Sequence, residues 1–103
     1  MKTLRKVTIT PVFLEGETHI PPFDEMKEGH IYISEFFNTS THRCLCGCGE
    51  KTVLPLNRKP GENWGWDLIK ENNGTISFKP SVGNFNYPCK SHYIITKNVA
   101  NFV

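Results

Sequence analysis

Cysteine and histidine crowd into one short segment in the middle of the chain. Cys44, Cys46 and Cys48 stand at alternate positions, His42 precedes them, and a fourth thiol, Cys89, comes much later. Tetrahedral zinc prefers thiolate and imidazole ligands, and glycines beside the cysteines let the backbone turn around an ion. We therefore expect a structural zinc site that ties the middle of the chain to its end.

The spacing leaves open which side chains hold the metal. Paired zinc-binding turns usually carry Cys-x2-Cys twice, whereas the first half here reads Cys-x-Cys-x-Cys. One solution uses all four cysteines and leaves both nearby histidines outside the metal site. Another uses two of the clustered cysteines together with Cys89 and His92. Disulfides, buried unliganded thiols and an iron site are the other interpretations of these cysteines.

Four side chains near this cluster have the chemistry of a hydrolytic site. Ser81 could attack a carbonyl carbon, with His42 or His92 as the base and Glu35 orienting the histidine. Beside an open zinc site, Glu35 could instead activate a metal-bound water. Each residue also has a plainer interpretation: Ser81 as a turn former after Pro80, the histidines as ligands or core residues, and Glu35 as a solvated strand end.

The elements that must position these residues are predicted to be short strands. Seven prolines and eight glycines divide the chain into short pieces, and β-branched and aromatic residues dominate those pieces. Asn72-Asn73-Gly74 between two alternating runs predicts a hairpin. Trp64 and Trp66 would share one face, either in the core or as a ledge for a substrate. The predicted strands are Lys2–Leu14, His30–Glu35, Phe36–His42 as a continuation or second arm, Thr52–Leu56, Trp64–Lys70, Thr75–Lys79, Ser91–Thr96 and Val99–Val103, with a short helix at Phe23–Glu28 and a loop at Pro80–Lys90.

Length and composition favour a mainly β fold, a small antiparallel sheet or barrel-like structure stapled by zinc. The chain has 103 residues, which suits one domain over residues 1–103 and is too short for two separate cores. A formal charge of +2 does not favour binding to nucleic acid or to a membrane surface. The sequence carries neither a signal-peptide pattern nor a run near the ~18 apolar residues of a membrane span. We therefore expect a cytoplasmic protein with reduced thiols.

The sequence resembles a family of small bacterial and phage proteins long described as a domain of unknown function, some of them misnamed ammonia monooxygenases. The resemblance covers about residues 28–103. It is carried by His-Ile-Tyr-Ile-Ser-Glu (30–35), His-x-Cys-x-Cys-Gly-Cys-Gly (42–49), the tryptophan stretch (64–66), Pro-Ser-Val-Gly-Asn (80–84) and Cys-x-Ser-His-Tyr-x-Ile (89–95).

Members of that family occur in operons for bacterial ubiquitination-like pathways, where they are regarded as the peptidase that trims or removes the ubiquitin-like protein. The resemblance implies a zinc-containing peptidase-like domain whose partner is a ubiquitin-like protein. The first hypothesis is thus a peptidase of serine type with structural zinc, or a zinc-dependent one, acting on the tail of that protein. The alternative is a non-catalytic, zinc-stabilised module that binds a partner protein. The oligomeric state stays open.

Overall fold

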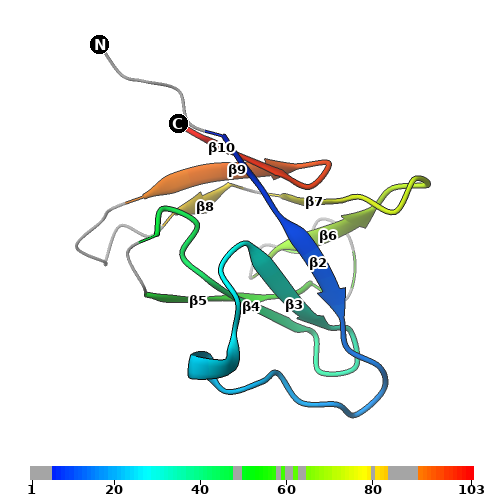
Figure 1. The fold of residues 1–103 in the computed structure, drawn as a ribbon. Helices are drawn as coiled ribbons and strands as arrows, with labels where there is room; N and C mark the ends of the chain where they lie inside the picture. Colours follow the sequence, from blue (N-terminus) through cyan, green and yellow to red (C-terminus); the bar gives the residue numbers. More distant parts are fainter. Residues whose placement is uncertain are drawn as a thin grey trace.

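The fold is mainly β, as predicted. The computed structural model describes residues 6–47, 50–57, 59, 62, 65–79, 81–83 and 91–103 (Figure 1). Its elements are β1 (Lys6–Thr8), β2 (Thr10–Phe13), the 3-10 helix η1 (Phe23–Glu25), β3 (His30–Ser34), β4 (Thr39–Arg43), β5 (Lys51–Pro55), β6 (Asp67–Lys70), β7 (Ile76–Lys79), β8 (Val82–Gly83), β9 (His92–Thr96) and β10 (Val99–Phe102). In this part of the chain no helix is long and apolar enough to cross a membrane.

The strands form two four-stranded sheets and a separate hairpin. One sheet has the order β1-β10-β9-β8 and is antiparallel throughout. The other has the order β2-β3-β4-β5, in which β2 and β3 run parallel and the remaining pairs are antiparallel. Figure 1 shows the strands of the first sheet above those of the second, with β2 descending from one layer to the other.

The first extended segment serves both sheets. The sequence predicts one strand over Lys2–Leu14, but the structure divides the described part at Ile9 into β1 and β2, which pair in different sheets. The backbone N–H of Ile9 donates to the carbonyl oxygen of Asn98 at 2.8 Å, and that of Thr10 donates to Gly29 at 2.7 Å. The prediction was wrong in treating the segment as one strand, because strand alternation does not reveal a change of partner.

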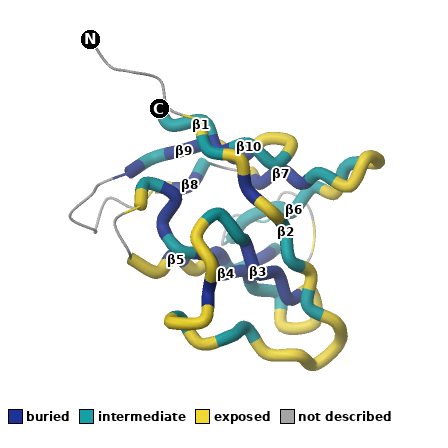
Figure 2. The backbone as a smooth tube through the Cα atoms, in the orientation of Figure 1, coloured by how far each residue is buried: buried dark blue, intermediate teal, exposed yellow. Residues whose placement is uncertain are grey.

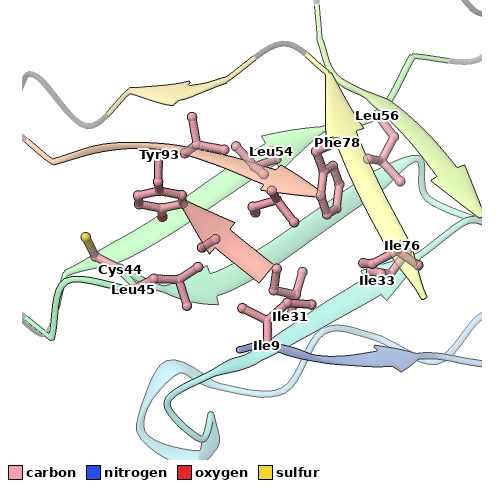
Figure 3. Packing of buried hydrophobic residues seen from close by; sticks show 13 residues of the cluster. Ile9, Ile31, Ile33, Cys44, Leu45, Leu54, Leu56, Ile76, Phe78 and Tyr93 are labelled. Carbon is pink, nitrogen blue, oxygen red and sulfur yellow. The ribbon is translucent and has the colours of Figure 1, made fainter. Parts of the chain in front are cut away.

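The hydrophobic core lies between the two four-stranded sheets. Figure 2 shows β3, β4 and β7 buried along most of their length, whereas buried residues alternate with exposed or half-buried ones along β5 and β9. Figure 3 shows the core side chains converging from both layers. The buried cluster consists of Ile9, Ile31, Ile33, Cys44, Leu45, Leu54, Leu56, Ile76, Phe78, Val82, Tyr93, Ile95 and Ala100.

Two hairpins follow the sequence prediction closely. β6 and β7 pair antiparallel across Asn72-Asn73-Gly74, where Gly74 has φ +86°. β9 and β10 pair across Lys97 and Asn98, which both have positive φ, as a tight hairpin turn requires. The predicted helix at Phe23–Glu28 is instead the single 3-10 turn η1.

The segment predicted as a loop over Pro80–Lys90 contains a short strand. Val82 and Gly83 form β8 at the edge of the first sheet and pair with Tyr93 and His92 of β9. Val82 is buried. The prediction missed β8 because a two-residue strand is fixed by its partner rather than by its own pattern. Residues 80 and 84–90 lie outside the described residues.

Candidate active site

Ser81 and His92 meet on one face of the β8–β9 pair. Val82 of β8 lies opposite Tyr93 of β9, and both side chains are buried. Because successive side chains of a strand point to opposite faces, their neighbours Ser81 and His92 lie on the outer face. There the Ser81 Oγ is 2.6 Å from the His92 Nε2, and the contact is part-buried. The structure thus joins two of the four predicted catalytic residues.

His42 lies in the core, on the opposite side of β9 from Ser81. It is fully buried on β4, and its Nε2 is 2.7 Å from the hydroxyl oxygen of Tyr93. Its Nδ1 has no hydrogen-bond partner among the described residues. Burial lowers the pKa of His42 to about 4, because desolvation penalises the imidazolium. A neutral core histidine on this face is separated from Ser81 by β9, so the geometry favours His92 as the partner of the serine.

Glu35 lies just beyond the end of β3, in a surface ion pair. Its carboxylate is 3.0 Å from the Nζ of Lys70 on β6, and the Glu35 side chain is 53% exposed. The Lys70 ammonium also lies 5.9 Å from the ring centroid of Phe13. The carboxylate is therefore engaged by a lysine in this structure, and its orientation of a histidine stays a prediction.

The first cysteines form a tight turn after β4. The Cys44 N–H donates to the Glu50 carbonyl at 2.8 Å, and the Gly47 N–H donates to the Cys44 carbonyl at 3.0 Å. Gly47 has φ +89°, which a side chain would strain. The sulfur atoms of Cys44 and Cys46 are 3.3 Å apart. That separation is far longer than a disulfide bond of about 2.05 Å, so these two thiols do not bridge each other.

The donor chemistry of this turn suits zinc. Two thiolates on tetrahedral zinc lie about 3.8 Å apart, given Zn–S bonds of about 2.3 Å, and the Cys44–Cys46 separation of 3.3 Å is shorter than that value. The Cys44 Sγ also lies 3.1 Å from the Ser91 Oγ, so the turn reaches the segment that follows Cys89. The described residues hold no group of three or more possible ligands. Cys48 and Cys89 lie outside the described residues, so the four-cysteine site stays a prediction.

Sequence reasoning missed three residues that support the site. Tyr93 bonds His42, Ser91 contacts Cys44, and the Trp66 indole Nε1 donates to the Ser81 carbonyl oxygen at 3.3 Å. The alternation in β9 signals that His92 and Tyr93 face opposite ways, and this could have singled out His92 in advance. The contacts of Trp66 and Ser91 depend on pairing between distant segments and leave no such signal. Trp66 packs against the core, as one of its two interpretations predicts, and Trp64 lies outside the described residues.

A serine hydroxyl hydrogen-bonded to an imidazole is the arrangement by which serine hydrolases activate their nucleophile. The Ser81–His92 contact has this arrangement, which makes it a candidate site of the serine hydrolase class. A family model described as "Bacterial ubiquitination-like system serine protease (BubE)" matches residues 17–103, and the chain belongs to that family. The match confirms the predicted resemblance to the peptidase component of such systems. No curated protein and no solved structure matches the chain.

Proposed function

We propose that this chain is a serine peptidase that cuts at the C-terminal tail of a bacterial ubiquitin-like protein, for processing or for deconjugation. Ser81 is the nucleophile and His92 is its base. The observation that carries the proposal is the 2.6 Å contact between the Ser81 Oγ and the His92 Nε2. The family supports the reaction class and the pathway, and the resemblance supplies the substrate class.

The chemistry follows from that contact. With its proton on Nδ1, the His92 ring accepts the Ser81 hydroxyl proton at Nε2 while Oγ adds to the scissile carbonyl carbon. The protonated ring then donates to the departing amine nitrogen as the C–N bond breaks, which leaves an acyl-serine. In the second half of the reaction His92 takes a proton from water as the hydroxide adds to the acyl carbon. The proton then passes to Oγ as the C–Oγ bond breaks, and the product leaves as a carboxylic acid that ionises in solution.

An extended tail suits the position of the serine. Ser81 immediately precedes β8, which is an edge strand of its sheet among the described residues. Edge strands present backbone groups with which an extended peptide can pair. A flexible C-terminal tail meets this requirement, whereas a folded surface does not.

Zinc enters the proposal as a structural ion held by Cys44, Cys46, Cys48 and Cys89. Its chemistry is to crosslink the turn after β4 to the segment before β9. The contact of 3.1 Å between Cys44 and Ser91 supports the approach of these two segments. Zinc on these ligands would hold the start of β9, and hence His92, without joining the reaction.

The test is cleavage of a fusion in which a bacterial ubiquitin-like protein carries a short C-terminal extension. Ser81→Ala and His92→Gln should each abolish turnover, with zinc content and melting temperature unchanged. Full cleavage by the Ser81→Ala enzyme would exclude Ser81 as nucleophile. Metal-dependent binding of the fusion without cleavage by the wild-type protein would favour the non-catalytic interaction module.

Glu35→Gln separates the serine mechanism from the metallopeptidase variant. If Glu35 activates a metal-bound water, this substitution abolishes turnover and Ser81→Ala does not. If Ser81 attacks instead, Ser81→Ala abolishes turnover and Glu35→Gln does not. Lys70→Met is the matched control, because it removes the ion pair and leaves the carboxylate in place.

A further inference from the structure

The carbonyl group of Ser81 points away from β9, beyond the edge of the sheet formed by β1, β10, β9 and β8. The His92 carbonyl accepts a hydrogen bond from the Val103 N–H at 3.0 Å, so the backbone groups of His92 face β10. Backbone groups alternate in direction along an antiparallel strand, and those of Tyr93 therefore face β8, where Val82 is its partner. The backbone groups of Ser81, next to Val82, face away from β9. The Ser81 carbonyl thus needs a partner from outside the sheet.

The Trp66 indole supplies that partner. Its Nε1–H donates to the Ser81 carbonyl oxygen at 3.3 Å. This bond and the Val82–Tyr93 pairing hold the backbone on the two sides of the Ser81 carbonyl group. A serine fixed in this way keeps its Oγ directed at His92 before any substrate binds.

Trp66 is itself held firmly by the end of β5. Its N–H donates to the Pro55 carbonyl and its own carbonyl accepts from the Asn57 N–H, both at 2.9 Å. It forms a parallel bridge with Leu56, and its ring packs against the core cluster. The preceding residue, Gly65, lies so close to β5 that an added Cβ would be 2.5 Å from the Pro55 carbonyl oxygen. The indole is therefore a rigid support.

We propose that Trp66 is a positioning residue for the serine nucleophile, and this inference rests on the proposed function. It ties the nucleophile peptide to the second sheet through β5. Without the indole N–H, the Ser81 peptide can rotate and its Oγ spends less time within reach of the His92 Nε2. Catalytic groups must stay within roughly 0.5 Å of their productive positions. The loss of the N–H therefore acts on the chemical step rather than on substrate binding.

The experiment compares Trp66→Phe with replacement of Trp66 by 3-benzothienylalanine, which keeps the bicyclic shape and lacks the N–H. Tyr32→Phe is the matched control. Tyr32 lies on β3, and the substitution deletes one hydrogen bond, which the Lys27 N–H donates to the Tyr32 hydroxyl oxygen at 3.0 Å. Cleavage of the extended ubiquitin-like fusion gives kcat and KM. A fluorophosphonate probe counts the reactive serines, so that kcat is expressed per reactive site.

Both Trp66 replacements should lower kcat per reactive serine about tenfold, the size of one hydrogen bond, with KM within about twofold. The 3-benzothienylalanine protein should keep the wild-type melting temperature within a few degrees, and Tyr32→Phe should keep kcat. An unchanged kcat per reactive serine in both replacements, beside an inactive Ser81→Ala protein, overturns the positioning role alone. Full cleavage by Ser81→Ala overturns the proposed function and the positioning role together.

Discussion

His92 and Tyr93 are neighbours on β9, and their side chains serve opposite faces of the strand. The His92 ring meets the Ser81 hydroxyl outside, at 2.6 Å, while the Tyr93 hydroxyl meets the His42 ring inside, at 2.7 Å. Ser91, one residue earlier, contacts Cys44 on the cysteine turn. Residues 91–93 thus contact the proposed nucleophile, the buried histidine and the cysteine turn of the expected metal site.

Removing the Tyr93 hydroxyl should destabilise the fold. In Tyr93→Phe the His42 Nε2 loses its partner and joins Nδ1 as a buried nitrogen without a hydrogen bond in the described structure. An unsatisfied buried polar group costs about 1–3 kcal/mol. Urea unfolding measures the loss, with Tyr32→Phe as the control for deleting a hydroxyl. Equal stabilities for wild type and Tyr93→Phe would contradict the role assigned to this pair.

The buried His42 should make stability depend on pH. Its pKa is about 4 in the fold and about 6.5 in the unfolded chain, so the unfolded chain takes up the proton first. The stabilising contribution is complete above pH of about 6.5, falls as the pH is lowered, and is lost near pH 4. The total change is about 3 kcal/mol, at about 1.4 kcal/mol per pKa unit.

Urea unfolding at pH values across this window, compared between wild type and His42→Asn, isolates the contribution of His42. Carboxylates and thiolates titrate in both proteins, and their effect cancels in the difference. The wild type should lose more stability than the variant on going from pH 6.5 to pH 4. Parallel curves would mean that His42 is not held neutral by the core.

Metal removal should weaken both the fold and the activity. We expect one equivalent of zinc in the purified protein, and a lower melting temperature after chelation, since a structural ion contributes directly to folding free energy. Cys44→Ser should remove the ion and lower turnover, because the start of β9 is then no longer tied to the turn after β4. Elemental analysis and calorimetry check this. A chelated protein with unchanged melting would refute the zinc site.

A methyl group at residue 65 should disturb the proposed support of Ser81 by Trp66. In Gly65→Ala the new Cβ would be 2.5 Å from the Pro55 carbonyl oxygen, so the backbone around Trp66 must shift. We expect a loss of about 1–3 kcal/mol in stability and a fall in kcat. Gly16→Ala is the control, because its Cβ meets nothing within 4 Å and only the φ of +52° opposes it. If both variants behave alike, the close approach at Gly65 has no special importance.

Local sequence patterns predicted much of the fold. Alternation located β3, β5 and β9, and Asn-Gly located the β6–β7 hairpin, because these signals depend on neighbouring residues. The division of the first strand at Ile9, the parallel β2–β3 pair and the short strand β8 all depend on partners distant in sequence. Local patterns contain no information about such partners, and these features could not be predicted.

The candidate site was predictable as a set of residues and not as a geometry. Ser81 and His92 belong to that set, and their contact arises from the β8–β9 register. Both histidines were equal candidates for the base until strand faces separated them, with His42 inside the core and His92 outside it. Glu35 shows the opposite outcome, since a residue of suitable chemistry is held at the surface by Lys70.

The place of β10 has a consequence for synthesis of the protein on the ribosome. β10 lies between β1 and β9, so it completes the sheet on which Ser81 and His92 meet. A ribosome adds residues in order, so β1 is synthesised long before β10, which is its partner within this sheet. The nascent chain therefore cannot assemble this sheet until Phe102 has left the exit tunnel.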